Sequence, residues 1–176
     1  MEYAWHYRLP GVRLLLDQEK AYDWVHPTYL RNVLLHVGLP SSLVLSLCSL
    51  FFSTSSSVLV NGFISNPVNQ GRGLRQGDPI SPVLFNLAFD PLRRSVLADP
   101  LFTGFSMHKH LGSFPMVSPA PIKVPGYADG ALCFLSTHRD FHQLQSSLLL
   151  YSRASNAKVD FHKTEEISLS GARQVD

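Results

Sequence analysis

The apolar residues of this chain recur with different spacings, and each spacing predicts a different element. The continuous run Val12 to Leu16 has the length of a buried strand and stops at Asp17. Two later segments have apolar residues three or four positions apart, the spacing of one helix face, and predict helices over about 27–37 and 41–52. The chain is therefore expected to begin with a strand followed by two helices.

Residues at the ends of the two helical segments have the chemistry of helix termini. Pro27 suits a first helical turn, where no backbone N–H is needed, and Gly38 suits a helix end. Ser41 and Ser42 can cap the second helix with a side-chain oxygen, and the serine run 53–57 should end it. These residues set the expected bounds of both helices.

Two turn dipeptides, Asn61-Gly62 and Asp129-Gly130, predict hairpins further along the chain. Both pairs tolerate the positive φ values of a tight two-residue turn, so each is expected to join two antiparallel strands. The flanking segments are Val58–Val60 with Asn66–Gln70, and Ile122–Pro125 with Ala131–Leu135.

The rest of the chain is expected to contain two helices, a strand and two irregular segments. A long helix begins at Ser81 and is bent or restarted by Pro91. The irregular segments are the glycine-rich stretch 71–79 and the proline-rich stretch 99–121, a loop or insertion. The remaining elements are a helix over about 139–154 and a strand over 167–169.

This order of elements, strand, two helices, hairpin, long helix, hairpin, helix and strand, predicts an α+β fold. A length of 176 residues with 45% hydrophobic content suits a single domain over residues 1–176.

Charge and composition argue against three classes of protein: one that binds phosphate by charge alone, a secreted protein and a membrane-spanning protein. The formal net charge of +2 permits a nucleic-acid partner but does not indicate a surface that binds phosphate by charge alone. The N-terminus lacks the pattern of a secretory signal, and the most apolar window, Leu43–Phe52, is well short of the roughly 20 residues that cross a bilayer. We therefore expect an intracellular protein, nuclear or cytoplasmic, with no membrane span.

The cysteines and histidines predict neither a disulfide framework nor a zinc site. Cys48 and Cys133 are far apart and form no Cys-x-x-Cys pair, which favours two buried thiols. Two close histidine pairs have no accompanying cysteines or acidic motif. These pairs are His108 with His110, and His138 with His142.

Two acidic residues stand at positions that could carry metal chemistry. Asp17 closes the first strand and Asp129 lies in the second predicted turn. Two carboxylates at strand ends are ligands that a divalent cation requires. The alternative is that Asp17 is a turn former or helix cap and Asp129 only a turn residue. The sequence between them does not indicate whether they meet.

Three stretches, in order, resemble the reverse transcriptase of non-LTR (LINE-type) retrotransposons. They are Leu-Leu-Asp-Gln-Glu-Lys-Ala-Tyr-Asp-Trp-Val at 15–25, Gly-Arg-Gly-Leu-Arg-Gln-Gly-Asp-Pro-Ile-Ser-Pro-Val-Leu-Phe-Asn at 71–86, and Tyr-Ala-Asp at 127–129. The resemblance covers about 12–169. It implies a right-hand polymerase palm, an antiparallel sheet backed by helices, with part of the fingers and no thumb.

The resemblance also implies an activity and roles for single residues. The activity is RNA-directed DNA synthesis from deoxynucleotides on an RNA template with a DNA primer. Asp17, the main-chain carbonyl of Gln18 and Asp129 would hold Mg²⁺ or Mn²⁺. Tyr22 would be an aromatic gate that excludes a 2′-hydroxyl, and Lys163 would donate charge or a proton to pyrophosphate.

The glycine-rich stretch supplies the other implied contacts. Gln76 would lie against the nascent base pair, and Gly73 and Gly77 would allow the backbone to approach it closely. Arg72 and Arg75 would contact template or phosphate. The alternatives remain open: Tyr22 as a core aromatic, a loop that only needs glycine φ angles, and two solvated arginines.

Three positions depart from the family pattern. Gly130 stands where a second aspartate follows Tyr-Ala-Asp, which removes one carboxylate ligand. Asn156 and Asp160 stand where glycine and asparagine are usual. Three interpretations follow: a polymerase impaired by Gly130 and by truncation, a catalytically dead remnant that binds RNA or a protein, and a decayed open reading frame whose product folds poorly.

Overall fold

The computed structural model describes residues 11–106, 120–127 and 130–171, and only the backbone at Tyr127. Contacts divide these residues into two compact units. The sheet unit holds the described residues up to Gln18, Leu92–Leu150 and those from Val159 onward, and the helical unit holds Glu19–Pro91 and Tyr151–Lys158. The expectation of a single domain stays a prediction.

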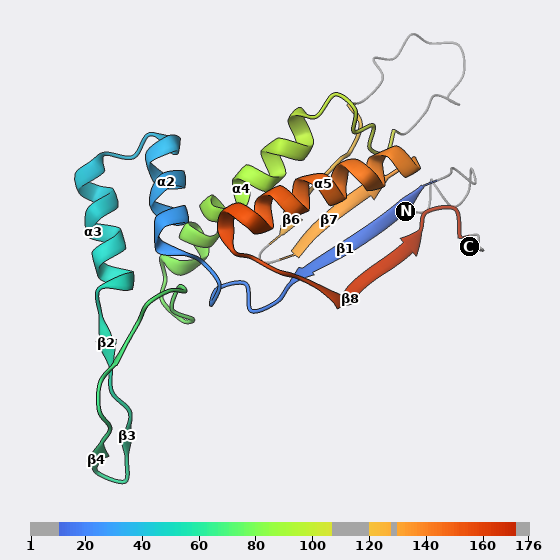
Figure 1. Cartoon of the computed structure of the whole chain (residues 1–176). Coiled ribbons are helices and arrows are strands. Elements are labelled where there is room, and N and C mark those ends of the chain that lie inside the picture. The colour runs from blue at the N-terminus through green and yellow to red at the C-terminus, as the bar shows by residue number, and fades with distance from the viewer. Residues whose placement is uncertain (1–10, 107–119, 128–129, 172–176) are drawn as a thin grey trace, which may run out of the picture. The chain divides into compact units, whose positions relative to one another are not determined.

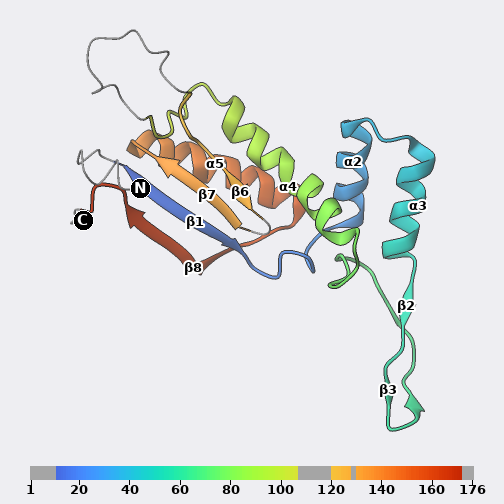
Figure 2. The same ribbon diagram turned by 180° about the vertical axis from the view of Figure 1, so that it is seen from behind.

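The sheet unit is a four-stranded antiparallel sheet in the order β6-β7-β1-β8. Helix α5 (His138–Ser155), whose residues 138–150 belong to this unit, crosses one face of the sheet (Figures 1 and 2). The strands are β1 (Val12–Gln18), β6 (Gly126–Tyr127), β7 (Gly130–Leu135) and β8 (Val159–Ser168). An antiparallel sheet with helix on one face confirms the α+β prediction.

The two faces of β1 differ in burial. Leu14 and Leu16 are buried, as are the β7 residues Ala131 and Cys133, whereas Leu15 is 40% exposed. Successive side chains of a strand point to opposite faces. Asp17 therefore lies with Leu15 on the open face of the sheet.

Strand β8 is longer than the sequence predicts and contains a bulge. Its predicted range was 167–169, but pairing with β1 begins at Val159. Opposite β1 the register shifts between Leu15↔Glu165 and Asp17↔Asp160, so residues 161–164 protrude as a bulge. The sequence does not predict the first part of this strand, because its residues are mostly polar and partly exposed. They lack the apolar alternation that marks a half-buried strand.

The hairpin before β7 is confirmed, but its register differs by one residue from the expected one. Tyr127 pairs with Gly130, so Gly130 is the first residue of β7 and not a central turn residue. Ile122 pairs instead with Phe105 in an isolated bridge. Ala128 and Asp129 lie outside the described residues.

The helical unit begins with the two predicted helices, α2 (Pro27–Val37) and α3 (Ser41–Phe52), both with the expected bounds. Gly38 ends α2 with a left-handed φ of 97°. The predicted serine caps of α3 are wrong, because Pro40 is its N-cap and no side chain bonds there. Ser41 is already helical.

A second correction concerns the hairpin after α3. Asn61-Gly62 does join two strands, β3 (Leu59–Val60) and β4 (Phe63–Ile64). The expected partner segment 66–70 instead contains β5 (Val68–Asn69), which pairs with β2 (Ser55–Ser56). The serine run that was expected only to end α3 therefore supplies a strand.

Helix α4 (Ser81–Ala98) runs through Pro91 without a restart, and the two units divide between Pro91 and Leu92. Both cysteines are free. Cys133 is buried as expected, and burial raises the pKa of its thiol to about 12, whereas Cys48 is only partly buried. Among the described residues, no helix is both long and apolar enough to span a bilayer.

Candidate active site

Two segments far apart in the sequence meet at one end of the sheet. Strands β1 and β7 pair with Leu16 opposite Ala131, and the next step of this register sets Gly130 beside Asp17. Asp129 precedes Gly130 in the sequence and lies outside the described residues. The sheet therefore pairs the strand of Asp17 with the strand that follows the Tyr-Ala-Asp motif in the sequence.

Lys163 of β8 contacts Asp17 on the open face. Its Nζ lies 3.6 Å from Asp17 Oδ2 and 3.8 Å from Asp160 Oδ2. The bulge at 161–164 brings Lys163 to this position, because Asp160 itself pairs with Asp17 across the strands. The structure thus brings together the first predicted carboxylate and the predicted lysine.

Asp160 also shapes the bulge that carries Lys163. Its Oδ1 accepts a hydrogen bond from His162 N at 3.1 Å, and its main-chain oxygen accepts one from Thr164 Oγ1 at 2.9 Å. In the sequence, Asp160 was noted only as a departure from the family pattern, and its role in the bulge was not predicted. Its partners depend on the strand register and could not be read from the sequence.

The residues around Asp17 fit a divalent cation only in part. Carboxylate oxygens are suitable ligands for Mg²⁺ or Mn²⁺. The Asp17 side chain is 30% exposed and that of Lys163 is 68% exposed. An exposed ion pair of this kind contributes about 0–1 kcal/mol, so a divalent cation could displace the ammonium group at little cost.

Gln18 is the last residue of β1, and its side chain is buried. Strand alternation points this side chain away from the face that holds Asp17. Neither of its amide atoms has a hydrogen-bond partner in the described structure. Only the main-chain carbonyl of Gln18, the group predicted as a ligand, could belong to the Asp17 site.

Tyr22, in the helical unit, is half-buried against helix α4. Its ring stacks on Phe85 with centroids 4.9 Å apart and an angle of 17° between the planes. Its main-chain oxygen accepts a hydrogen bond from Leu74 N at 2.8 Å. These contacts hold Tyr22 next to the glycine-rich stretch, and they agree with both the gate and the core interpretation.

The glycine-rich stretch is irregular, as expected, and Gly73 has a structural reason for its identity. Its φ is 86°, and a Cβ there would lie 3.0 Å from the backbone oxygen of Asp23. Gly77 also has a left-handed φ, of 87°, with open space around it. Gln76 and Gly77 are both exposed.

The two predicted arginine contacts differ. The Arg75 guanidinium donates to Leu50 O at 2.9 Å, Thr54 Oγ1 at 2.6 Å and Gln70 Oε1 at 3.3 Å, which joins the loop to the end of α3. Arg72 is exposed and lies 4.0 Å from the centre of the Trp24 ring. Arg72 therefore presents its donors to solvent, whereas those of Arg75 are used within the fold.

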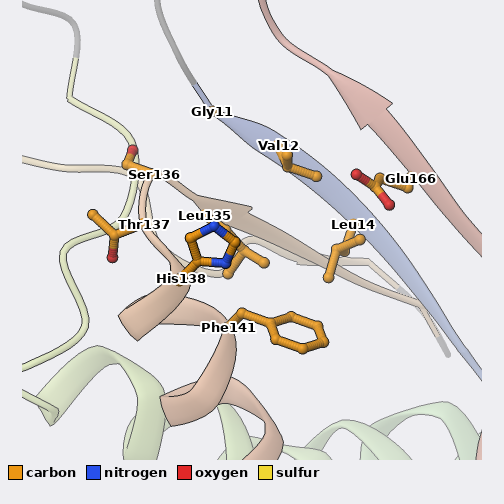
Figure 3. Close-up of a pocket in the computed structure, with 9 residues that line it drawn as sticks. All are labelled: Gly11, Val12, Leu14, Leu135, Ser136, Thr137, His138, Phe141 and Glu166. Atoms are coloured by element: carbon orange, nitrogen blue, oxygen red, sulfur yellow. The ribbon is translucent and has the colours of Figure 1, made fainter. Parts of the chain in front are cut away.

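A cavity of about 330 Å³ opens near Val12 and Leu135, which pair at the end of the β1–β7 ladder away from Asp17. Figure 3 shows His138 and Phe141 of α5 and Glu166 of β8 around it. None of the predicted site residues that the structure describes lines this cavity. The described lining residues are Gly11, Val12, Leu14, Leu135, Ser136, Thr137, His138, Phe141 and Glu166.

His108 and His110 lie outside the described residues. Within residues 11–106, 120–127 and 130–171, no group of three or more histidine, cysteine or acidic side chains could hold a metal ion.

Comparison with known proteins identifies the family. The sequence profile of the family "Reverse transcriptase (RNA-dependent DNA polymerase)" matches residues 6–175. The chain is 29% identical over 164 residues to a 149 kDa protein of transposon TX1 from Xenopus laevis. It is 25% identical over 156 residues to a Pol polyprotein of the retrotransposable element R2DM from Drosophila melanogaster. These matches cover 93% and 89% of this chain but only 12% and 14% of the relatives.

Solved structures of telomerase from Candida tropicalis have the same fold. The complex with a TWJ fragment of telomeric RNA superposes with a TM-score of 0.63 at 12% identity, over 91% of this chain and 26% of the telomerase chain. The apo enzyme truncated from its C-terminal domain gives 0.60 at 12% identity, over 95% and 33%. The chain therefore belongs to the reverse transcriptase (RNA-dependent DNA polymerase) family and is related to the polymerases of the TX1 and R2 non-LTR retrotransposons.

Proposed function

We propose that this chain is part of the catalytic core of an RNA-directed DNA polymerase, with its sheet as the palm and part of the fingers in the helical unit. One observation carries the proposal. The β1–β7 pairing joins the strand that contains Asp17 to the strand that follows the Tyr-Ala-Asp motif in the sequence. A polymerase needs two carboxylates at one place, and these strands supply a rigid support for them.

The proposed roles follow from the chemistry of each group. Asp17 and Asp129 hold Mg²⁺ or Mn²⁺ through carboxylate oxygens, with the main-chain carbonyl of Gln18 as a further oxygen. The metal, when bound, neutralises triphosphate charge and lowers the pKa of the primer 3′-hydroxyl. Lys163, 3.6 Å from Asp17, can give charge or a proton to the departing pyrophosphate.

The helical unit would bind the nucleotide and the template. Gln76 and Gly77 lie in an exposed, irregular stretch that can approach the nascent base pair. Arg72 is available for a phosphate group. Arg75 is better explained as a structural residue, because its donors bind the end of α3.

Extension of a DNA primer on an RNA template tests the proposed function. We expect measurable extension with Mn²⁺ or Mg²⁺, and a loss of about 100-fold or more in Asp17→Asn, because this change removes a charged ligand. Equal extension by the two proteins, or none by the wild type under any metal, would contradict the assignment. Circular dichroism of Asp17→Asn controls for misfolding.

Ribonucleotide discrimination tests the role of Tyr22. Tyr22→Val should raise ribonucleotide incorporation relative to deoxynucleotide by about 10- to 100-fold, because the smaller side chain leaves room for a 2′-hydroxyl. Tyr22→Phe keeps the ring on Phe85 and should keep the selection. If Tyr22→Val folds and discriminates like the wild type, Tyr22 is only a core aromatic.

Gly130 favours a second candidate function, a nucleic-acid-binding remnant without catalysis. The second carboxylate of the family pattern is absent at the position next to Asp17. In that case the wild type binds primed template but does not extend it, and binding is unchanged in Asp17→Asn.

A further inference from the structure

Two cations and one indole ring form a cluster in the helical unit. The Arg72 guanidinium carbon lies 4.0 Å from the centre of the Trp24 ring, and Lys158 Nζ lies 4.9 Å from it. Arg72 and Lys158 are both exposed. No carboxylate in the described part of the chain lies within ion-pair distance of either. We call Trp24, Arg72 and Lys158 the cationic platform.

Backbone hydrogen bonds hold together the segments that carry the platform. Glu19 N donates to Lys158 O at 2.9 Å, which joins the segment after β1 to the segment before β8. Gly73 N donates to Val25 O, also at 2.9 Å, which joins the neighbours of Arg72 and Trp24. The platform is therefore built into the fold rather than assembled by flexible side chains alone.

No carboxylate in the described ranges forms an ion pair with the cations of the platform. Two positive groups near one ring repel each other, and the attraction of each to the ring offsets this only in part. The nearest acidic residues in sequence, Glu19 and Asp23, form no ion pair with either cation in the described structure. An anion bound to either cation would supply negative charge that offsets the repulsion.

The geometry of the arginine favours phosphate as that anion. A guanidinium that stacks on an aromatic ring keeps its N–H edge free, and this edge matches a phosphate group in a bidentate manner. The ammonium group of Lys158, which also lies over the Trp24 ring, supplies a second hydrogen-bond donor. Arg72 also stands four residues before Gln76 in the stretch proposed to lie against the nascent base pair.

We propose that the cationic platform binds the phosphodiester backbone of the single-stranded RNA template. The proposal rests on the proposed polymerase function and adds two residues, Trp24 and Lys158, to the nucleic-acid contacts. Trp24 positions the two cations and contacts no phosphate itself.

Binding of a short labelled single-stranded RNA, followed by fluorescence anisotropy across a salt series, tests the platform. Each lost phosphate contact lowers the slope of log affinity against log salt by about 0.7 for single strands. We expect this loss in Arg72→Gln and in Lys158→Gln, and about twice this loss in the double variant. Arg31→Gln is the matched control, because it removes one exposed positive charge from α2.

Trp24→Leu separates positioning from charge. It leaves the net charge unchanged but should lower the salt slope, because the cations lose the surface that holds them, and Trp24→Phe should restore most of the slope. Circular dichroism verifies that each variant folds.

The possible results distinguish this inference from the proposed function. If the double variant and Arg31→Gln have the same slope of log affinity against log salt, the cationic platform does not bind RNA. The polymerase assignment then remains intact. A second result would also overturn the RNA-binding role of the platform. In it, a deoxynucleoside triphosphate displaces the RNA from the wild type but not from the double variant, because the two cations then bind the nucleotide. Absence of RNA binding by the wild type contradicts the proposed function itself.

Discussion

Gly130→Asp should raise primer extension by roughly 10- to 100-fold, the range that supporting groups of a metal site contribute. The β1–β7 register ends with Leu16 opposite Ala131, and its continuation by one residue sets position 130 opposite Asp17. Directly opposite residues point to the same face of a sheet. Their Cβ atoms then lie about 4.5–5.5 Å apart. A new carboxylate would thus stand next to Asp17 on the open face.

The same change should make stability depend on the metal. Like charges directly opposite in a sheet destabilise it, so Gly130→Asp should melt at a lower temperature than the wild type in the presence of a chelator. Mn²⁺ should abolish this difference in melting temperature, because a cation bound by both carboxylates removes the repulsion. Thermal melts with and without metal measure both effects.

Two variants serve as controls for this prediction. The Asn side chain of Gly130→Asn has nearly the same size as Asp and the same effect on the backbone, but it carries no charge. Gly130→Asn should therefore neither gain activity nor respond to Mn²⁺. Gly130→Asp combined with Asp17→Ala should be inactive, because the gain depends on a shared metal. Equal activity of Gly130→Asp and Gly130→Asn would show that position 130 does not contribute a ligand.

Asp140→Ala should destabilise the protein by roughly 3–5 kcal/mol, since three partly buried N–H groups would lose their acceptor at about 1–3 kcal/mol each before relaxation. The Asp140 side chain is fully buried. It accepts hydrogen bonds from Thr103 N at 2.6 Å, Ser136 N at 2.8 Å and Thr137 N at 3.2 Å. Thr137 Oγ1 in turn accepts from Asp140 N at 3.1 Å.

Urea unfolding measures this loss, and Asp99→Ala is the matched control. Asp99 Oδ1 accepts a hydrogen bond from Leu101 N at 2.8 Å in an exposed turn, so its removal should cost about 1 kcal/mol. Asp140→Asn keeps one acceptor oxygen and should fall between the two. If Asp140→Ala loses no more than Asp99→Ala, the buried carboxylate does not hold these segments together.

Local chemistry in the sequence was sufficient for most helices. The bounds of α2 and α3 follow from apolar spacing with Pro27 and Gly38, because a helix is stabilised by contacts within a few residues. The same reasoning failed for the cap of α3 and for the β2–β5 pair. Strand partners are chosen by the whole sheet, and Ser55–Ser56 has no apolar pattern that would mark a strand.

The sequence by itself determined the motifs that indicate the family: the Asp17 segment, the glycine-rich stretch and the Tyr-Ala-Asp motif, with glycine at position 130. These are short motifs, and each can be identified without its neighbours in space. The match of the family profile to residues 6–175 confirms the family that they indicated.

Only the tertiary structure decided which of these residues meet. The β1–β7 register brings Gly130 beside Asp17, and the β8 bulge brings Lys163 to the same carboxylate. Only the fold shows that the donors of Arg75 are used internally while Arg72 and Lys158 share Trp24. The physical reason is that strand register and side-chain contacts depend on the simultaneous packing of distant segments, which no local pattern encodes.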